Sequence, residues 1–359
     1  MELTATRRSR PGPASRLGVA PSAHTTRLDA ACRRVPDFIA LMKPRVMALA
    51  VFTAVVGLLI APAHVDPVLG AVAVLAITAG AGAAGALNMW YDADVDALMS
   101  RTASRPIPQG RVAGAEALAF GLVLAAAAVV VLALSANATA AALLAFTIFF
   151  YIAVYSAWLK RSTPQNIVIG GAAGALPPVI GWTAATGQIG LEPLVLFLII
   201  FLWTPPHFWA LSLNRSSDYA RAGVPMLPLV AGKAATKRQI LIYSALLALA
   251  STLPCVLGFG GTIYAATAAI CAAVLIALAS QLKSSSETDR RAAHRLFAFS
   301  IVYLFLLFAS LLIEHAAEPW SSTQSWSGAR MSTGSAQAEA LPRLVRTACR
   351  STTARTGEV

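Results

Sequence analysis

The chain has 359 residues, of which 57% are hydrophobic and only 12% charged, and its formal net charge is +12. Soluble domains carry roughly 45–50% apolar residues, so this composition argues against a water-soluble fold and indicates an integral membrane protein. The positive charge does not indicate nucleic-acid binding, because the basic residues lie in the tails and in short connections between apolar stretches.

Both ends of the chain are polar. Residues 1–36 are rich in Arg, Pro and Ser, which predicts a disordered basic cytoplasmic tail. An Arg-rich, acid-poor start also resembles a mitochondrial transit peptide, but we favour a bacterial inner (plasma) membrane protein. Residues 316–359 are rich in Ser, Thr, Ala and Arg and contain nothing that could span a bilayer, so we expect a second disordered tail. The membrane domain is therefore predicted at 37–315.

Nine apolar stretches between the tails are long enough to cross a hydrocarbon core, for which roughly 20 residues are needed. The stretches cover residues 46–63, 67–90, 113–134, 138–159, 166–186, 191–213, 240–258, 262–281 and 295–313. This pattern predicts an all-α fold, a polytopic bundle of nine transmembrane helices around a central cavity.

The connections between these stretches alternate in charge. Lys and Arg precede the first stretch and follow the second, fourth, sixth and eighth, whereas the loops around residues 64, 135, 187 and 260 contain neither. The positive-inside rule then places the N-terminus and all the basic loops in the cytoplasm. An odd number of spans places the C-terminal tail outside.

Polar residues recur at intervals of four where the second stretch ends, at Asn88, Asp92 and Asp96. This spacing stacks the three side chains on one helix face and turns Asp94 roughly the other way. Carboxylates at a membrane boundary are costly and normally mark a functional site. Carboxylate and carboxamide oxygens suit Mg²⁺, which binds in this way together with substrate phosphates. The alternative is an acidic helix end solvated at the interface.

A basic loop containing Arg101 and Arg105 follows the acids directly. Guanidinium groups match phosphate oxygens, so acids that hold a metal and arginines that hold a diphosphate would act together. The alternative is anchoring charge on the cytoplasmic side. Lys160 and Arg161 follow the fourth stretch, and Lys160 is a plausible diphosphate contact. The glycines Gly170, Gly171 and Gly174 that come next indicate close helix packing rather than catalysis.

A second polar cluster follows the sixth stretch on the same side. Asp218 could complete a second metal position, and Arg215 or Arg221 could bind phosphate. His207 lies inside the apolar stretch and could orient or ligate a substrate. The ordinary interpretation of a lone intramembrane histidine is a hydrogen-bonded structural residue, and we favour it over ligation.

Taken together, these residues resemble the UbiA-type intramembrane prenyltransferases and, within that family, the branch that farnesylates haem. The resemblance covers roughly residues 37–315. It is carried by Lys43-Pro44-Arg45-Val46, by the Asn88/Asp92/Asp96 array with Arg101 and Arg105, by Trp203-Thr-Pro-Pro-His207-Phe-Trp209, and by Asp218-Tyr219. One departure is Asn214, which stands where relatives with two Asp-rich arrays have a carboxylate four residues before Asp218.

The resemblance implies transfer of a farnesyl group from farnesyl diphosphate to a vinyl group of haem b, with addition of water, to give haem O. It implies Mg²⁺ as the cofactor, haem as a substrate, and haem A synthase or oxidase assembly proteins as possible partners. The implied catalytic residues are Asn88, Asp92, Asp96, Lys160 and Asp218, and all of these except Lys160 are the expected metal ligands. The implied substrate-binding residues are Lys43, Arg45, Arg101, Arg105, Arg161, His207, Arg215 and Arg221.

Three alternatives stay open at this stage. The same scaffold could act on an aromatic quinone precursor, which should not need His207 and its aromatic neighbours. A secondary transporter would place its acids near the bilayer midplane between repeats, whereas here they gather at helix ends and no internal repeat is visible. A catalytically silent assembly factor would bind haem without Mg²⁺-dependent turnover.

Overall fold

The computed structural model describes residues 34–286 and 289–317, and the two predicted tails lie almost entirely outside these ranges. Eight helical segments are long and apolar enough to cross a membrane. They are α3 (Pro67–Tyr91), α5 (Gly114–Ser135), Ala138–Ser162, Asn166–Thr186, α10 (Leu191–Asn214), Gly232–Val256, α15 (Thr262–Ser284) and α16 (Arg290–Ala317). A ninth span results if Arg34–Leu41 and α2 (Pro44–Leu59), which are bent by 52°, are taken as one. The predicted all-α membrane bundle is confirmed; its central cavity stays a prediction.

Several spans are built from more than one helix. The third segment contains α6 (Ala138–Phe149), a π-helix η1 (Phe150–Leu159) and α7 (Lys160–Ser162). The fourth contains α8 (Asn166–Ala175) and α9 (Pro177–Thr186), and the sixth contains α13 (Gly232–Ala250) and α14 (Leu253–Val256). Three short helices lie outside the spans: α4 (Ala93–Leu98), α11 (Ser216–Arg221) and α12 (Leu227–Val230).

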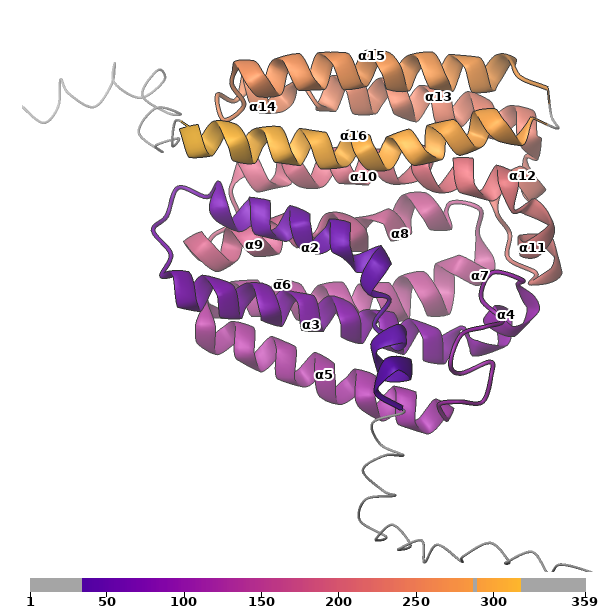
Figure 1. Cartoon of the computed structure of the whole chain (residues 1–359), viewed down its shortest axis with the longest axis horizontal. Coiled ribbons are helices and arrows are strands. Elements are labelled where there is room, and N and C mark those ends of the chain that lie inside the picture. Colours follow the sequence, from indigo (N-terminus) through magenta and orange to yellow (C-terminus); the bar gives the residue numbers. More distant parts are fainter. Residues whose placement is uncertain (1–33, 287–288, 318–359) are drawn as a thin grey trace, which may run out of the picture.

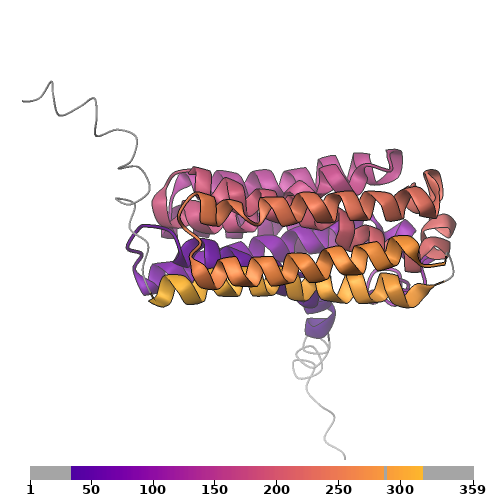
Figure 2. The same cartoon turned by 90° about the horizontal axis from the view of Figure 1, so that it is seen from above.

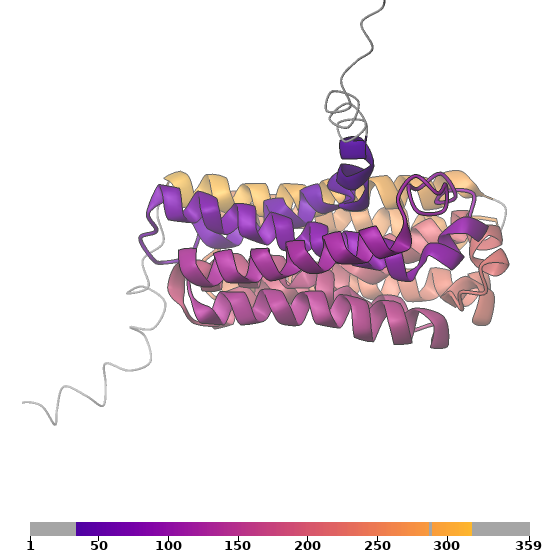
Figure 3. The same ribbon diagram turned by 90° about the horizontal axis from the view of Figure 1, so that it is seen from below.

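The long helices lie roughly along one common axis (Figures 2 and 3), and α4, α7, α11 and α12 gather at the same end of the bundle (Figure 1). One buried cluster joins α10, α13, α15 and α16, and a second joins α2, α3, α5, α6 and α9. The helix Arg34–Leu41 runs across the others (Figure 3) and covers a third, smaller cluster on α3 and α5. The polar loops of the predicted cytoplasmic side therefore meet at one end.

Some helix ends differ from the predicted ends. The predicted seventh span begins at residue 240, whereas α13 begins at Gly232 and includes Lys233, Lys237 and Arg238. The reason is that hydropathy detects only the part of a helix that lies in lipid, while hydrogen bonding continues the helix into the polar region. The first span ends earlier than predicted, because α2 stops at Leu59.

Helices α2 and α9 approach each other closely at two glycines. A Cβ atom on Gly57 would lie 2.2 Å from the Pro178 carbonyl oxygen, and a Cβ atom on Gly181 would lie 2.0 Å from the Ala54 carbonyl oxygen. Both distances are far below van der Waals contact, so only glycine permits this packing of backbone against backbone. The contact places α9 in the middle of the bundle, between the two large buried clusters.

Candidate active site

The predicted register of Asn88, Asp92 and Asp96 is present at the end of α3. Asp92 is the single residue between α3 and α4, yet its N–H donates to the Asn88 carbonyl oxygen at 2.9 Å and its own carbonyl oxygen accepts from the Asp96 N–H at 2.8 Å. The three residues are almost fully buried, with 4%, 0% and 2% of their surface exposed. The side chain of Asp94 is 63% exposed, in agreement with its predicted outward direction.

The Asn88 carboxamide lies at the centre of a hydrogen-bond network. Its Nδ2 donates to Asp92 Oδ2 at 2.7 Å and to Ser156 Oγ at 2.8 Å, and its Oδ1 accepts from the Lys43 ammonium. Ser156 in turn donates to the Tyr151 carbonyl oxygen at 2.9 Å, a bond across five residues within η1. Short π-helices are frequent at functional sites. Here η1 presents Ser156 to the Asn88 carboxamide, a contact that sequence reasoning missed.

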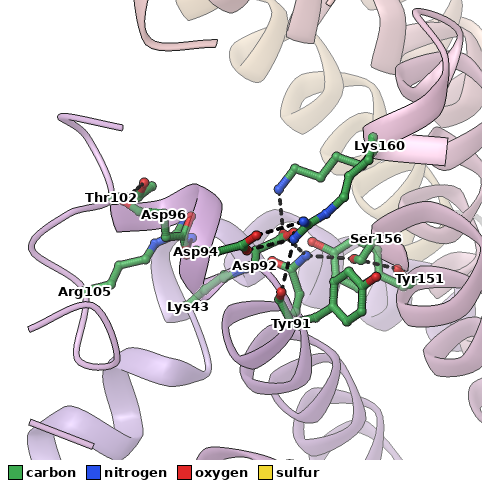
Figure 4. Close-up of polar contacts among 12 residues, drawn as sticks. Lys43, Tyr91, Asp92, Asp94, Asp96, Thr102, Arg105, Tyr151, Ser156 and Lys160 are labelled. Atoms are coloured by element: carbon green, nitrogen blue, oxygen red, sulfur yellow. Dashed lines mark hydrogen bonds and ion pairs between the residues drawn. The ribbon is translucent and has the colours of Figure 1, made fainter. Parts of the chain in front are cut away.

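Each acid of the array also contacts a cation. Lys160 Nζ lies 2.6 Å from Asp92 Oδ2, and Arg105 Nη1 lies 2.5 Å from Asp96 Oδ2 (Figure 4). The cations are only 15% and 20% exposed and the carboxylates 0% and 3%. Pairs shielded in this way interact more strongly than surface pairs, because little water screens the charges. The structure thus brings Lys160 and Arg105 to the acids, as the sequence predicts.

Arg161 binds Asp94, the acid that points away from the array. Its two terminal nitrogens each lie 2.8 Å from one oxygen of Asp94, and its guanidinium carbon lies 5.1 Å from the centre of the Tyr91 ring. The guanidinium holds the pKa of the Asp94 carboxyl below its usual value. Arg161 Nη2 also lies 3.9 Å from Asp92 Oδ1. Arg161 therefore links the exposed edge of the array to its buried centre.

Lys43 reaches the array from a strained position in the backbone. It lies between Arg34–Leu41 and α2 with φ 56° and ψ 52°, and it is the one non-glycine residue with positive φ in the part of the chain that the structure describes. Such a conformation costs on the order of 1–3 kcal/mol and persists where surrounding contacts hold it, often at functional sites. The bend directs the Lys43 ammonium onto Asn88. Arg45, two residues later, is exposed.

Asp218 lies in α11, at the same end of the bundle. Its two carboxylate oxygens accept from the Ser100 hydroxyl at 3.0 and 2.8 Å, and Oδ1 also accepts from Arg221. These contacts, that of Ser100 first, hold the pKa of Asp218 below its usual value. The bonds of Ser100 join the loop after α4 to α11. Within the described ranges, no three His, Cys, Asp or Glu side chains lie close enough to share a metal ion.

Two further predicted arginines flank this second loop. Arg101 is exposed and lies beside the Tyr219 phenol, whose pKa burial raises above its usual value. Arg215 is exposed at the start of α11. The predicted cationic residues therefore surround the end of the bundle at which the acids lie, although Arg101 and Arg215 form no ion pair among the described residues.

His207 is 9% exposed within α10 and is enclosed by aromatic rings. Its ring stacks on Trp203, with centroids 4.3 Å apart, and on Phe297 of α16, with centroids 4.6 Å apart. Its Nδ1 lies 2.7 Å from Ser300 Oγ. The structure therefore shows a hydrogen-bonded histidine that joins α10 to α16, in agreement with the ordinary interpretation. A role in binding haem stays a prediction.

Comparison with known proteins identifies the family. Residues 50–311 match the model of the UbiA prenyltransferase family. The chain belongs to this family. It is 62% identical over 281 residues to protoheme IX farnesyltransferase 1 of Mesorhizobium japonicum, a match that covers 78% of this chain and 90% of that protein. It is 59% identical over 282 residues to protoheme IX farnesyltransferase of Methylobacterium nodulans, covering 78% and 89% of the two chains. It is therefore an integral membrane prenyltransferase.

Solved structures of two other proteins have the same fold. A digeranylgeranylglyceryl phosphate synthase superposes with a TM-score of 0.65 at 19% identity, covering 78% of this chain and 98% of the other. A UbiA homolog from Archaeoglobus fulgidus bound to GPP and Mg²⁺ superposes with a TM-score of 0.55 at 15% identity, covering 77% and 99%. Similarity at this level of identity establishes the shared architecture of the membrane domain.

One oxygen of this UbiA-family site has chemistry that fits a metal ion. Asp92 Oδ1 is buried and accepts no hydrogen bond from the described residues. A buried carboxylate oxygen that accepts no hydrogen bond is costly. Binding to a hard divalent cation such as Mg²⁺ would compensate its charge. Asp96 and the carboxamide oxygen of Asn88 are further hard donors, but each is bound by a cation here. These residues therefore fit Mg²⁺ if Arg105 and Lys43 release them.

The bond between Ser100 and Asp218 gives a first testable prediction. We expect Ser100→Ala to loosen the loop after α4, because a hydrogen bond to a charged group contributes about 1.5–3 kcal/mol. Backbone amide exchange over residues 99–112 should become faster by roughly tenfold or more, measured by hydrogen–deuterium exchange mass spectrometry. The matched control is Ser104→Ala, since Ser104 is exposed in the same loop. Equal exchange rates in the two variants would argue that the bond does not hold the loop.

Proposed function

We propose that this chain transfers the farnesyl group of farnesyl diphosphate to a vinyl group of haem b. The farnesyl C–O bond breaks and diphosphate leaves with the bonding electrons. The vinyl group then attacks the allylic cation, water adds to the resulting cation, and a proton is lost, which gives haem O. The names of relatives with 57–62% identity support this acceptor and donor. The observation that carries the proposal is the buried Asp92 in its network of cations.

We propose Asn88, Asp92 and Asp96 as ligands of Mg²⁺, with Asp218 as a candidate ligand of a second ion. When bound, Mg²⁺ would neutralise charge on the departing diphosphate. The metal bound to the relative from Archaeoglobus fulgidus supports this assignment. Asp92 Oδ1, which is buried and accepts no hydrogen bond from the described residues, supports it independently, on the geometry of this chain.

The cations around the acids would bind the diphosphate. Lys160 and Arg105 hold ammonium and guanidinium donors within 2.6 Å of the acids, so a diphosphate arriving at the array would meet donors already in position. Preorganised donors of this kind stabilise charge that develops in the transition state without reorganisation. We propose the same role, from their position around the same end of the bundle, for Lys43, Arg45, Arg101, Arg161, Arg215 and Arg221.

An acceptor other than haem is the nearest alternative. A prenyltransferase acting on a quinone precursor would need the same acids. A silent assembly factor would bind haem without Mg²⁺-dependent turnover. The relatives' names favour haem over the quinone precursor, and membership of the prenyltransferase family argues against a transporter.

We also propose the compartment and the domain limits. The bacterial relatives and the clustering of basic loops at one end support an inner membrane protein with a cytoplasmic N-terminus, a membrane domain over 37–315, and tails over 1–36 and 316–359. A haem A synthase or oxidase assembly protein would be a fitting partner, because such proteins would consume or receive the product.

The function is tested by product analysis. Purified protein in detergent is incubated with haem b, farnesyl diphosphate and Mg²⁺, and the products are examined by mass spectrometry. We expect haem O to form and its formation to stop with EDTA and resume when Mg²⁺ is added back. Formation of haem O in the presence of EDTA would contradict the metal assignment. Absence of haem O from folded protein, with a prenylated product formed when a quinone precursor replaces haem b, would contradict the acceptor.

A further inference from the structure

A cavity of about 450 Å³ opens at the ends of α13 and α15, outside the site described above. It is lined by Ala234, Ala235, Lys237, Arg238, Lys283 and Ser285. Three of these side chains are cationic, and none is acidic. In Figure 1, α13 and α15 form the edge of the bundle opposite α3 and α5. The cavity therefore has its own charge and a location separate from the acids of the active site.

Lys237 is buried in the wall of this cavity, with 6% of its surface exposed. Its ammonium donates to the Ser285 carbonyl oxygen at 2.8 Å, to the Ser285 hydroxyl at 3.2 Å and to the Ser286 carbonyl oxygen at 3.1 Å. These acceptors are all neutral, so hydrogen bonds satisfy the ammonium, but no carboxylate among the described residues forms an ion pair with it. A buried charge without an opposite charge is costly, which favours an anion in the cavity.

Arg238 and Lys283 add two exposed cations at the same cavity. Neither forms an ion pair within the described ranges. The nearby acid Asp289 accepts from the backbone N–H groups of Arg291 and Ala292 at the start of α16. A structural role in which Lys237 anchors the end of α15 would account for the burial of that lysine alone. The positive-inside rule accounts for cations on this side of the membrane, but not for the placement of three of them around one cavity.

An apolar stripe leads away from the cavity along α13. Ile242, Leu246 and Leu249 follow Arg238 at intervals of four, four and three residues, so the four side chains share one helix face. The three apolar residues are 43%, 43% and 68% exposed, as expected for a surface in contact with lipid chains. A charged head group in the cavity would therefore have its hydrocarbon chains directly on this stripe.

We propose that the cavity binds the phosphate head group of an anionic phospholipid, with an acyl chain lying along Ile242, Leu246 and Leu249. Guanidinium and ammonium groups bind phosphate oxygens through charge-assisted hydrogen bonds, and basic pockets between membrane helices are typical sites for anionic head groups. Free phosphate has the same head-group chemistry. It would make no use of the apolar stripe.

The test measures lipid retention by the full-length protein in a nonionic detergent, using native mass spectrometry with phosphatidylglycerol, phosphatidylcholine or inorganic phosphate added. We expect phosphatidylglycerol to stay bound and phosphatidylcholine to be lost. The double substitution Arg238→Gln/Lys283→Gln should lower the affinity for phosphatidylglycerol by about tenfold or more. The charge-preserving pair Arg238→Lys/Lys283→Arg should retain most of it.

The matched control is Arg290→Gln/Arg295→Gln, which removes the same charge from exposed positions on α16 that do not line the cavity. We expect this pair to bind phosphatidylglycerol like the wild type. An equal loss in both Gln pairs would overturn the proposal in favour of unspecific attraction by surface charge. Inorganic phosphate that binds as tightly as phosphatidylglycerol and displaces it would overturn the assignment to a lipid.

Discussion

Asp92→Asn should lower the rate of prenyl transfer by at least about a hundredfold while the protein stays folded and membrane-inserted. The side chain is fully buried, its Oδ2 accepts from Asn88 and Lys160, and its Oδ1 has no hydrogen-bond partner among the described residues. Asparagine keeps the shape but removes the charge that would hold a metal ion and that positions Lys160. The measurement is the initial rate of product formation at saturating farnesyl diphosphate, with thermal unfolding recorded in parallel.

The neighbouring acid supplies the control for this substitution. Asp94 lies between Asp92 and Asp96 in the sequence and also binds a cation, Arg161, through both carboxylate oxygens. Its side chain is 63% exposed and points away from the buried acids. We therefore expect Asp94→Asn to change the rate by no more than a fewfold. Similar losses in the two variants would show that negative charge at this helix end matters but that the buried position of Asp92 does not.

The membrane architecture was predictable because apolar length alone decides whether a helix can span a bilayer. Each of the nine predicted stretches overlaps one helical segment, with the first corresponding to the bent pair of Arg34–Leu41 and α2. The internal structure of the spans was not predictable in this way. The π-helix η1 is about as apolar as the α-helix α6 that precedes it, so hydropathy does not distinguish the two.

The acid array was predictable from local spacing, because residues four apart share a helix face whatever surrounds them. The partners of these acids depend on contacts between distant segments. Ser156 lies 68 residues from Asn88, and Ser100 lies 118 residues from Asp218. A single serine, in a loop as Ser100 or in a helix as Ser156, has no periodicity that would distinguish it from its neighbours. Lys43 could be singled out because Lys43-Pro44-Arg45-Val46 resembles the family. The left-handed backbone that directs Lys43 to Asn88 could not be predicted from the sequence.

The close contact between α2 and α9 leads to the second large effect, which concerns stability rather than chemistry. We expect Gly181→Ala to destabilise the protein by about 3 kcal/mol and to lower its apparent Tm in detergent by roughly 6 °C at a fixed scan rate. The added Cβ would lie 2.0 Å from the Ala54 carbonyl oxygen, which is backbone, so α2 itself must move. Alanine's better helix propensity, about 1 kcal/mol, offsets only part of this cost.

Gly174→Ala is the matched control, because Gly174 is a helical glycine in the same span that is exposed and has open space around its Cβ position. The predicted packing role is confirmed for Gly170 and Gly171, whose added Cβ atoms would lie 2.2 Å from Tyr155 and 2.9 Å from Thr204, and is wrong for Gly174. Gly174→Ala should therefore leave the apparent Tm unchanged or raise it slightly. If Gly181→Ala behaved in the same way, α2 and α9 would have to be separable at little cost, and the glycine contact would not determine where α9 lies in the bundle.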